Sequence, residues 1–244
     1  MYHPFSIAET IKTSWGILKS NFVTIVVYSA IIFLILSVMG FLGEFVIAAV
    51  DSFWAQSLLS VVVLIVQGYT TLGLYKLIFT LIDSEFYEFE FKQIIPTIRM
   101  VFNYIIVIFL LAVVLITYLK VLDYCFADYP IGVYVGRTIG LLVGLYLAFR
   151  WMFYISFIVD EDCGPIESLN SSFRLSDNNL WKIVGLMLII LLFIAIPVQI
   201  AQFFPAATLA IIITYPFVNI ILIVAYRKLI YSHLDVDDDV TETI

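Results

Sequence analysis

The sequence contains six apolar stretches, each long enough to cross a lipid bilayer. A helical span needs about 20 mostly apolar residues at ~1.5 Å each to cross ~30 Å of hydrocarbon. The bilayer core holds no water to satisfy backbone groups, and no stretch alternates as a barrel strand does, so each is predicted to be a helix. The six expected spans are residues 22–49, 57–82, 101–126, 134–159, 180–204 and 206–231.

The composition favours an integral membrane protein over a soluble one. Of the 244 residues, 63% are hydrophobic and 13% are charged, whereas ordinary globular chains are roughly 45–50% apolar and about 25% charged. A soluble domain with so few polar residues would lack the means to cover its surface. The net charge of −7 and the lack of a basic run argue against a nucleic-acid partner. The expected class is therefore an all-α integral membrane protein.

Short connections join the expected spans in pairs. Residues 51–56 link the first two spans, residues 127–133 link the third and fourth, and Pro205 separates the fifth from the sixth. A joint this short brings consecutive helices back alongside each other, so each pair is predicted to form a helical hairpin.

An amphipathic helix is expected before each hairpin. Ser6 and Glu9 supply a capping box for the first, in residues 5–20, and Gly164-Pro165 begins the third. The second, around Phe86 to Met100, is interrupted by Pro96. The predicted apolar faces are Ile7, Ile11, Trp15 and Leu18 in the first helix and Ile166, Leu169 and Phe173 in the third. All three helices are expected to lie in the inner membrane interface or beneath the bundle.

The basic residues predict the orientation. Ten of the 12 Lys and Arg residues fall on one side of the expected spans, and only Lys120 and Arg137 lie toward the other. The positive-inside rule makes the richer side cytoplasmic. We therefore expect a multi-pass protein of the bacterial cytoplasmic (inner) membrane with both termini cytoplasmic, ending in an acidic tail at residues 233–244. Cys125 and Cys163 fall near opposite faces and are not expected to pair.

The order amphipathic helix, span, short turn, span recurs three times in a single transmembrane bundle, residues 1–232. The expected repeats are residues 5–83, 84–160 and 161–235. A basic residue next to an aromatic one leads to an aspartate at the end of each, at Asp83, Asp160 and Asp235. Positive-inside bias alone also places basic residues there, so both interpretations of these side chains stay open.

The chain resembles a known group of proteins over most of its length, in residues 15–21, in Ala225-Tyr226-Arg227-Lys228 and chiefly in one segment. That segment runs Asp160-Glu161-Asp162-Cys163-Gly164-Pro165, then Ser172-Phe173-Arg174-Leu175 and Asn179-Leu180-Trp181, with Ser168 where Ala is usual. Similar segments occur in bacterial six-helix membrane proteins, including the membrane domain of glycerophosphoryl diester phosphodiesterases and related uncharacterised families. The resemblance implies a fold and a membrane location. It implies no activity, because the chemistry of that family belongs to a separate soluble domain that these 244 residues leave no room for.

Residues suited to catalysis are scarce. The chain has two histidines, His3 and His233, at its two ends, and it contains no H-E-x-x-H motif, P-loop or Rossmann glycine pattern. We therefore expect no enzyme activity, no catalytic residue and no bound cofactor or metal.

Arg150 is the most conspicuous polar residue within the spans. Only 13 residues separate it from Arg137, which is ~19.5 Å of helix against ~30 Å of hydrocarbon. One interpretation places Arg150 in a cytoplasm-open cavity, in contact with an anionic group such as a lipid phosphate. The other is that it snorkels to the interface among aromatic neighbours. Gln67, Gln199 and Gln202 are the further candidates to line a pathway with it.

Three glycines predict a close helix–helix contact. Gly136, Gly140 and Gly144 form two consecutive G-x-x-x-G steps on one face of the fourth span. This pattern lets two backbones approach, and it leaves open whether the second helix belongs to this chain or to another.

Two function classes remain. The first is a non-catalytic accessory or scaffold protein that packs against membrane lipids or another membrane protein, through the glycine face or the cytoplasmic amphipathic helices. The second is a transporter or binder of a lipid or small amphiphile. If Arg150, Gln67, Gln199 and Gln202 converge on one cavity, transport is favoured; if they are scattered, the scaffold is favoured.

Overall fold

The structure is a computed structural model of the whole chain, and it describes residues 5–50, 52–83, 91–177 and 179–241. The described residues form helices joined by short turns and contain no strand. Six helical segments are long and apolar enough to cross a membrane, as the sequence predicts. They are Phe22–Ala49, Phe53–Asp83, Lys92–Cys125, Pro130–Asp160, Leu180–Phe203 and Ala207–Tyr231.

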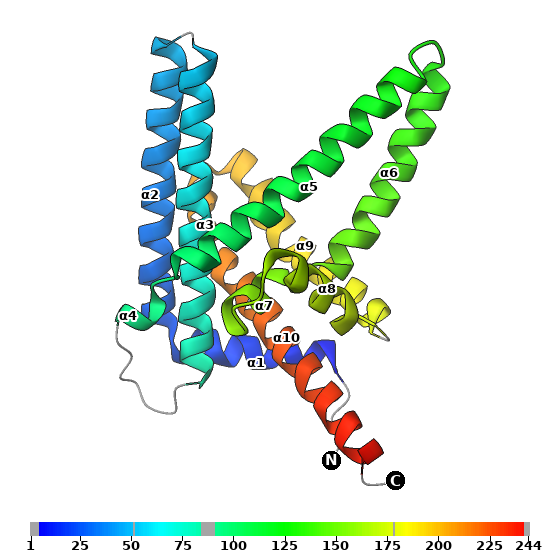
Figure 1. Cartoon of the computed structure of the whole chain (residues 1–244). Helices are drawn as coiled ribbons and strands as arrows, with labels where there is room; N and C mark the ends of the chain where they lie inside the picture. Colours follow the sequence, from blue (N-terminus) through cyan, green and yellow to red (C-terminus); the bar gives the residue numbers. More distant parts are fainter. Residues whose placement is uncertain (1–4, 51, 84–90, 178, 242–244) are drawn as a thin grey trace.

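The first three helices form an L-shaped unit. Helix α1 (Ile7–Ser20) lies across one end of the molecule, and α2 (Phe22–Ala49) and α3 (Phe53–Asp83) stand side by side (Figure 1). The chain turns from α1 into α2 at Asn21, whose side-chain Nδ2 donates to the carbonyl of Ile17 (3.2 Å). We call the end that holds α1 the base, and the opposite end, where α2 ends and α3 begins, the tip.

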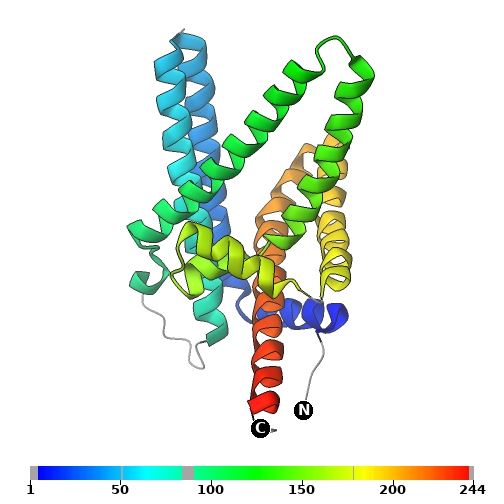
Figure 2. The ribbon, with the colours of Figure 1, turned by 45° about the vertical axis from the view of Figure 1, so that its right-hand side comes forward.

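The next pair of long helices meets at the tip and diverges toward the base. Helix α4 (Phe91–Ile94) leads to α5 (Ile98–Cys125), which is capped by the Thr97 hydroxyl accepting from the Met100 N–H (3.3 Å). Helix α6 (Pro130–Arg150) then returns toward the base, and the two axes form an inverted V (Figures 1 and 2).

A turn within the fourth apolar segment was not expected. The sequence predicts one continuous helix over 134–159, but α6 ends at Arg150, and a new helix, α7 (Tyr154–Asp160), begins after residues 151–153. Helix α8 (Pro165–Leu175) stabilises this turn, because its Ser172 hydroxyl donates to the Arg150 carbonyl (2.9 Å) and accepts from the Phe153 N–H (3.1 Å).

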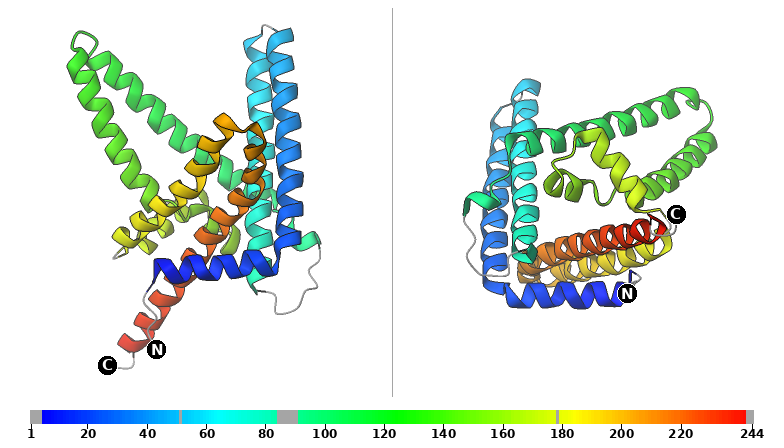
Figure 3. Two further views of the ribbon diagram at one scale, coloured as in Figure 1. Left: turned by 180° about the vertical axis from the view of Figure 1, so that it is seen from behind. Right: turned by 60° about the horizontal axis from the view of Figure 1, so that its bottom comes forward.

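The last two long helices complete the fold. Helix α9 (Leu180–Phe203) is followed by the short 3-10 helix η1 (Pro205–Ala210) and by α10 (Ile211–Thr241). The backbone of α10 continues through most of the expected acidic tail, 233–244, whose side chains lie outside the described residues. Viewed from the base, α9 and α10 run between α1 and the α7–α8 pair (right panel of Figure 3).

The core lies in the half of the molecule nearer the base. Tyr75 of α3 and Tyr226 of α10 are almost completely buried. The Tyr226 ring meets Phe79 and Phe157 edge to face, with ring centroids 5.9 and 5.0 Å apart. By contrast, none of the 21 residues of α6 is buried. The halves of α3 and α10 nearer the base therefore form much of the core, and α6 contributes little to it.

Helices α1 and α8 turn small hydroxyl residues toward the protein. Thr10 and Ser14 of α1 are completely buried, as are three serines of α8, namely Ser168, Ser172 and Ser176 at its C-cap. Of the predicted apolar faces, Leu18 is buried and Leu169 packs against the core, whereas Trp15 is 56% exposed and Ile166 73% exposed. Thr10 and Ser14 donate to carbonyls one turn back (2.8 and 2.7 Å), so small residues pack closely without losing hydrogen bonds.

The predicted capping box at the start of α1 is wrong. The Ser6 side chain makes no capping hydrogen bond. Glu9 instead forms an ion pair with Lys228 of α10 (Oε2 to Nζ, 3.3 Å). The tertiary contact to α10 therefore replaces the local cap.

Candidate functional site

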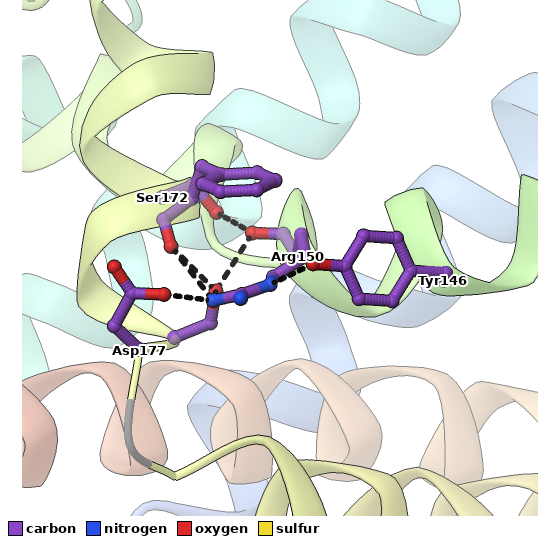
Figure 4. Close-up of polar contacts among 6 residues, drawn as sticks. Tyr146, Arg150, Ser172 and Asp177 are labelled. Carbon is purple, nitrogen blue, oxygen red and sulfur yellow. Dashed lines mark hydrogen bonds and ion pairs between the residues drawn. The ribbon is translucent and has the colours of Figure 1, made fainter. Parts of the chain in front are cut away.

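Arg150, the last residue of α6, contacts residues in and next to α8 and is largely shielded from solvent. Its Nε donates to the Tyr146 hydroxyl (3.1 Å), its Nη1 donates to the Phe173 carbonyl (3.3 Å), and the same nitrogen forms an ion pair with Asp177 (Figure 4). The guanidinium also lies over the Phe173 ring, 4.4 Å from its centroid. The side chain is only 14% exposed.

These contacts differ from snorkelling, whereas the cavity interpretation stays a prediction, because the Nη2 nitrogen of Arg150 makes no hydrogen bond within the described residues. A snorkelling arginine would extend its head into water, and an arginine in a binding cavity would keep donors free for the ligand. Here Asp177 neutralises the charge, and the Phe173 carbonyl near the end of α8 takes a donor, as a cation at a helix C-terminus does. Arg150 therefore fastens the end of α6 to the end of α8.

The glutamines do not gather around Arg150. Gln67, Gln199 and Gln202 are all exposed, on α3 and near the far end of α9. Arg150 contacts Asp177, just before α9 begins, whereas Gln199 is 19 residues into that helix, about 28 Å along its axis. Within the described residues, the four polar side chains predicted to mark a pathway are scattered.

The glycine face meets α5 for part of its length. A Cβ atom added to Gly136 would lie 2.1 Å from Leu122, and one added to Gly140 would lie 2.5 Å from Tyr118. The Tyr118 hydroxyl also donates to the Gly136 carbonyl (2.7 Å). At Gly144 no heavy atom would lie within 4 Å of such a Cβ. Two glycines thus pack within this chain, and the third faces open space.

An apolar cavity occupies the space where α5 and α6 diverge. Its volume is about 400 Å³. The residues that line it from α6 and its C-terminal end include Gly140, Gly144 and Trp151. We call it the hairpin cavity. The remaining lining residues are Leu111, Val114, Leu115, Tyr118, Ile139, Val143, Leu147 and Ala148. No side chain of this lining is charged, so the cavity suits an apolar occupant.

A charged junction at the base was not predicted from the sequence. The Nη2 atom of Arg227, on α10, lies 2.7 Å from Asp83 Oδ2 at the end of α3 and 3.1 Å from Asp160 Oδ1 at the end of α7. The Tyr226 hydroxyl donates to the other Asp160 oxygen (3.1 Å). We call these four residues the base junction. The sequence marked the two aspartates as repeat ends, but their convergence on one arginine depends on how α3, α7 and α10 pack.

A second cavity adjoins the base junction. It has a volume of about 390 Å³, and we call it the base cavity. Its lining combines one cation, two carboxylates and two neutral polar side chains. The lining residues are Lys76, Phe79, Thr80, Asp83, Gln93, Val159 and Asp160.

The turn between α7 and α8 is fixed by contacts from α5. Asn103 Nδ2 donates to the Cys163 carbonyl (3.0 Å), and Arg99 forms an ion pair with Asp162 (3.4 Å). Asp162 adopts φ 52°, a left-handed conformation that aspartate tolerates better than most residues. Burial, reinforced by the Glu161 carboxylate, raises the pKa of Cys163 to about 11. Cys125 is exposed, and both thiols are free.

No group of three His, Cys, Asp or Glu residues that could hold a metal ion occurs among the described residues. The side chains of His3 and His233 lie outside those residues.

Comparison with known proteins gives no match. No protein family, curated protein or solved structure shows significant similarity to this chain. The resemblance to the membrane domain of glycerophosphoryl diester phosphodiesterases therefore stays a prediction from the residues that carry it.

Proposed function

We propose that this chain is a non-catalytic accessory or scaffold protein of the bacterial cytoplasmic membrane. In this arrangement α2–α3, α5–α6 and α9–α10 cross the bilayer as three hairpins, and α1 and α8 lie at the inner interface. Ten of the 12 basic residues support a cytoplasmic base, because they belong to the base side of the spans. The exposed apolar residues of α1 and α8, Trp15 and Ile166, then meet the interface, where aromatic and aliphatic side chains are favoured.

The observation that carries the proposal is the unpartnered face of α6. The helix buries none of its residues within the chain, and its Gly140–Gly144 step opens onto the hairpin cavity. Apolar surface against lipid gives no hydrophobic drive to associate, so helix association in a bilayer depends on close packing at small residues. We propose that the cavity receives a transmembrane helix of another integral membrane protein.

The transport alternative stays a prediction, and the described part of the chain supports it less than it supports the scaffold. Its candidate residues, Arg150, Gln67, Gln199 and Gln202, are scattered, and Arg150 already has an anionic partner in Asp177. A pathway for a polar or charged group would need several such side chains along one route.

A matched pair of glycine substitutions tests the proposal. A Cβ added to Gly144, at the hairpin cavity, or to Gly40, on α2, would have no heavy atom within 4 Å, so the fold should tolerate leucine at either position. The full-length protein, purified from its native membrane in mild detergent, should carry a stoichiometric integral membrane protein detectable by mass spectrometry. Gly144→Leu should lose that protein, because its side chain fills the docking space.

Gly40→Leu should retain the partner at the wild-type ratio. The proposal fails if the protein elutes alone, or if both variants keep or lose the same protein to the same extent.

A further inference from the structure

The base cavity has an ordered arrangement of charge along α3. Lys76, Thr80 and Asp83 follow one another at spacings of four and three residues, so they lie on one face of the helix. Seven residues separate Lys76 from Asp83, which corresponds to about 10 Å along the axis. Because α3 ends at Asp83 at the base, Lys76 lies deeper in the membrane-spanning segment than the carboxylate does.

At one end of the cavity, the carboxylates of Asp83 and Asp160 share Arg227 as their ion-pair partner. Asp83 and Asp160 both contact one nitrogen of Arg227, at 2.7 and 3.1 Å. Among the described residues, two carboxylates share one guanidinium, so Arg227 alone does not neutralise both. Lys76 carries a positive charge at the deeper side, and among the described residues its Nζ makes one hydrogen bond, to the Ile95 carbonyl (3.0 Å). An ammonium has three donors, and no described residue accepts a hydrogen bond from the other two.

We propose that the base cavity binds the headgroup of a phospholipid that carries a terminal primary ammonium, as in phosphatidylethanolamine. In such a lipid the phosphate lies next to the glycerol and the hydrocarbon, and the ammonium lies on the water side. The order of charges along α3 is the complement of this order, with Lys76 facing the phosphate and Asp83 and Asp160 facing the ammonium. The cavity volume of about 390 Å³ lies within the usual range for small-ligand sites, roughly 300–1,000 Å³.

Other ligand classes fit this cavity less well. A purely anionic headgroup would meet Lys76 but also the two carboxylates. A quaternary ammonium has no N–H to donate to Asp83 or Asp160, so phosphatidylcholine would lose the hydrogen bonds that fix its position. The neutral side chains of Thr80 and Gln93 add donors and acceptors that tolerate either end of a zwitterion.

The test uses the full chain, stripped of lipid and then incubated with equal amounts of phosphatidylethanolamine, phosphatidylcholine and phosphatidylglycerol that have identical acyl chains. Native mass spectrometry measures retention. Phosphatidylethanolamine should be retained about tenfold better than either competitor, the expected loss for one charge-assisted contact. Lys76→Gln should lower that retention about tenfold, whereas Lys182→Gln, an exposed lysine of α9, should leave it unchanged.

A second variant separates binding from folding. Gln93 makes no hydrogen bond with the described residues and is exposed, so Gln93→Trp should fill the cavity while the Asp83–Arg227 ion pair stays intact. It should lose phosphatidylethanolamine selectivity at an unchanged thermal midpoint. Equal retention of the three lipids, or wild-type selectivity in both Lys76→Gln and Gln93→Trp, would overturn the proposal. Displacement of the lipid by an equimolar amount of free glycerophosphoethanolamine would also overturn it, because the ligand would then be a soluble zwitterion.

Discussion

The half of α10 nearer the base and the whole of α6 are both apolar, but they pack in opposite ways. Helix α10 buries nine hydrophobic side chains between Phe217 and Leu229, whereas α6 buries none. Both are apolar helices of bilayer length, so hydrophobicity alone does not determine which of them enters the core. The difference lies in what they contact. Helix α10 is surrounded by α1, α2, α3 and α9, whereas α6 has fewer contacts with its neighbours α5, α8 and α9.

This difference shows how a membrane bundle acquires a fixed centre and a free edge. Aromatic side chains interlock around Tyr226, and the base junction ties the ends of α3, α7 and α10 to one arginine. Such contacts are specific because lipid cannot reproduce them. The α5–α6 pair lacks them over most of its length, and many of its large apolar side chains are exposed.

A tyrosine pair gives the largest expected contrast. Tyr226→Ala removes a completely buried ring and should destabilise the protein by about 3–5 kcal/mol. Tyr134→Ala removes a ring of α6 that is 73% exposed, and its effect should stay within about 0.5 kcal/mol. Thermal unfolding in detergent measures both. Equal destabilisation by the two substitutions would abolish the distinction between core and edge.

Two glycines test how closely helices pack in the core and at α6. A Cβ on Gly68 would lie 2.9 Å from the ring of Tyr104, which is buried and stacked on Tyr154. Gly68→Leu should therefore cost about 1–3 kcal/mol through overpacking. Gly144→Leu should leave the thermal midpoint of the isolated protein unchanged, because that position faces open space. A loss of stability at Gly144 would mean that α6 is packed more tightly than its geometry indicates.

The two arginines of α6 allow the comparison within one helix. Arg150→Gln removes the ion pair to Asp177 and the bond to the Phe173 carbonyl, and should cost about 2 kcal/mol. Arg137 pairs with Asp123 at the other end, where both side chains are about half exposed, so Arg137→Gln should cost less than about 1 kcal/mol. The thermal midpoints of the two variants provide the measurement. The reverse order would contradict the role of Arg150 as the attachment of α6 to α8.

The cysteines test the same contrast without a large change in stability. The thiolate is the reactive form, and the pKa of Cys163 is raised from 9.0 to about 11. Its alkylation should be negligible near pH 8 and should rise as the pH approaches 11, whereas exposed Cys125 should react near pH 8. A raised folded-state pKa favours the native state below pH 9 and loses that contribution as the pH rises toward 11. Single-cysteine variants and mass analysis of adducts measure both rates, and comparable rates at pH 8 would show that the turn at 161–164 is open.

The sequence predicts the spans well because their signal is local. Length, apolar content and the breaks at residues 50–52, 126–129 and 204–205 are properties of neighbouring residues. The glycine face is also readable from the sequence, since Gly136 and Gly140 do approach α5 closely. The identity of the helix that packs against this face cannot be predicted from the sequence. Residue spacing shows which face of a helix has small residues, but it does not show which helix contacts that face.

The sites were harder to predict because they depend on packing between distant segments. Arg150 drew attention as a charge in an apolar stretch, but its partners Phe173 and Asp177 lie beyond a turn at 151–153 that the hydrophobic pattern does not mark. In α8 the predicted apolar face includes Ile166, which is exposed, and the serines of the helix are buried. Apolar residues turn inward when the outside is water, and small residues turn inward when the outside is lipid.

Photocrosslinking in the native membrane tests the central claim most directly. A photoreactive amino acid would replace Val143, which lines the hairpin cavity, or Leu34, which is exposed on α2 and serves as the control. If α6 docks a helix of another integral membrane protein, the Val143 position gives one discrete adduct to a single protein and the Leu34 position does not. If both positions give only lipid adducts, α6 faces the bilayer alone and the scaffold proposal is contradicted.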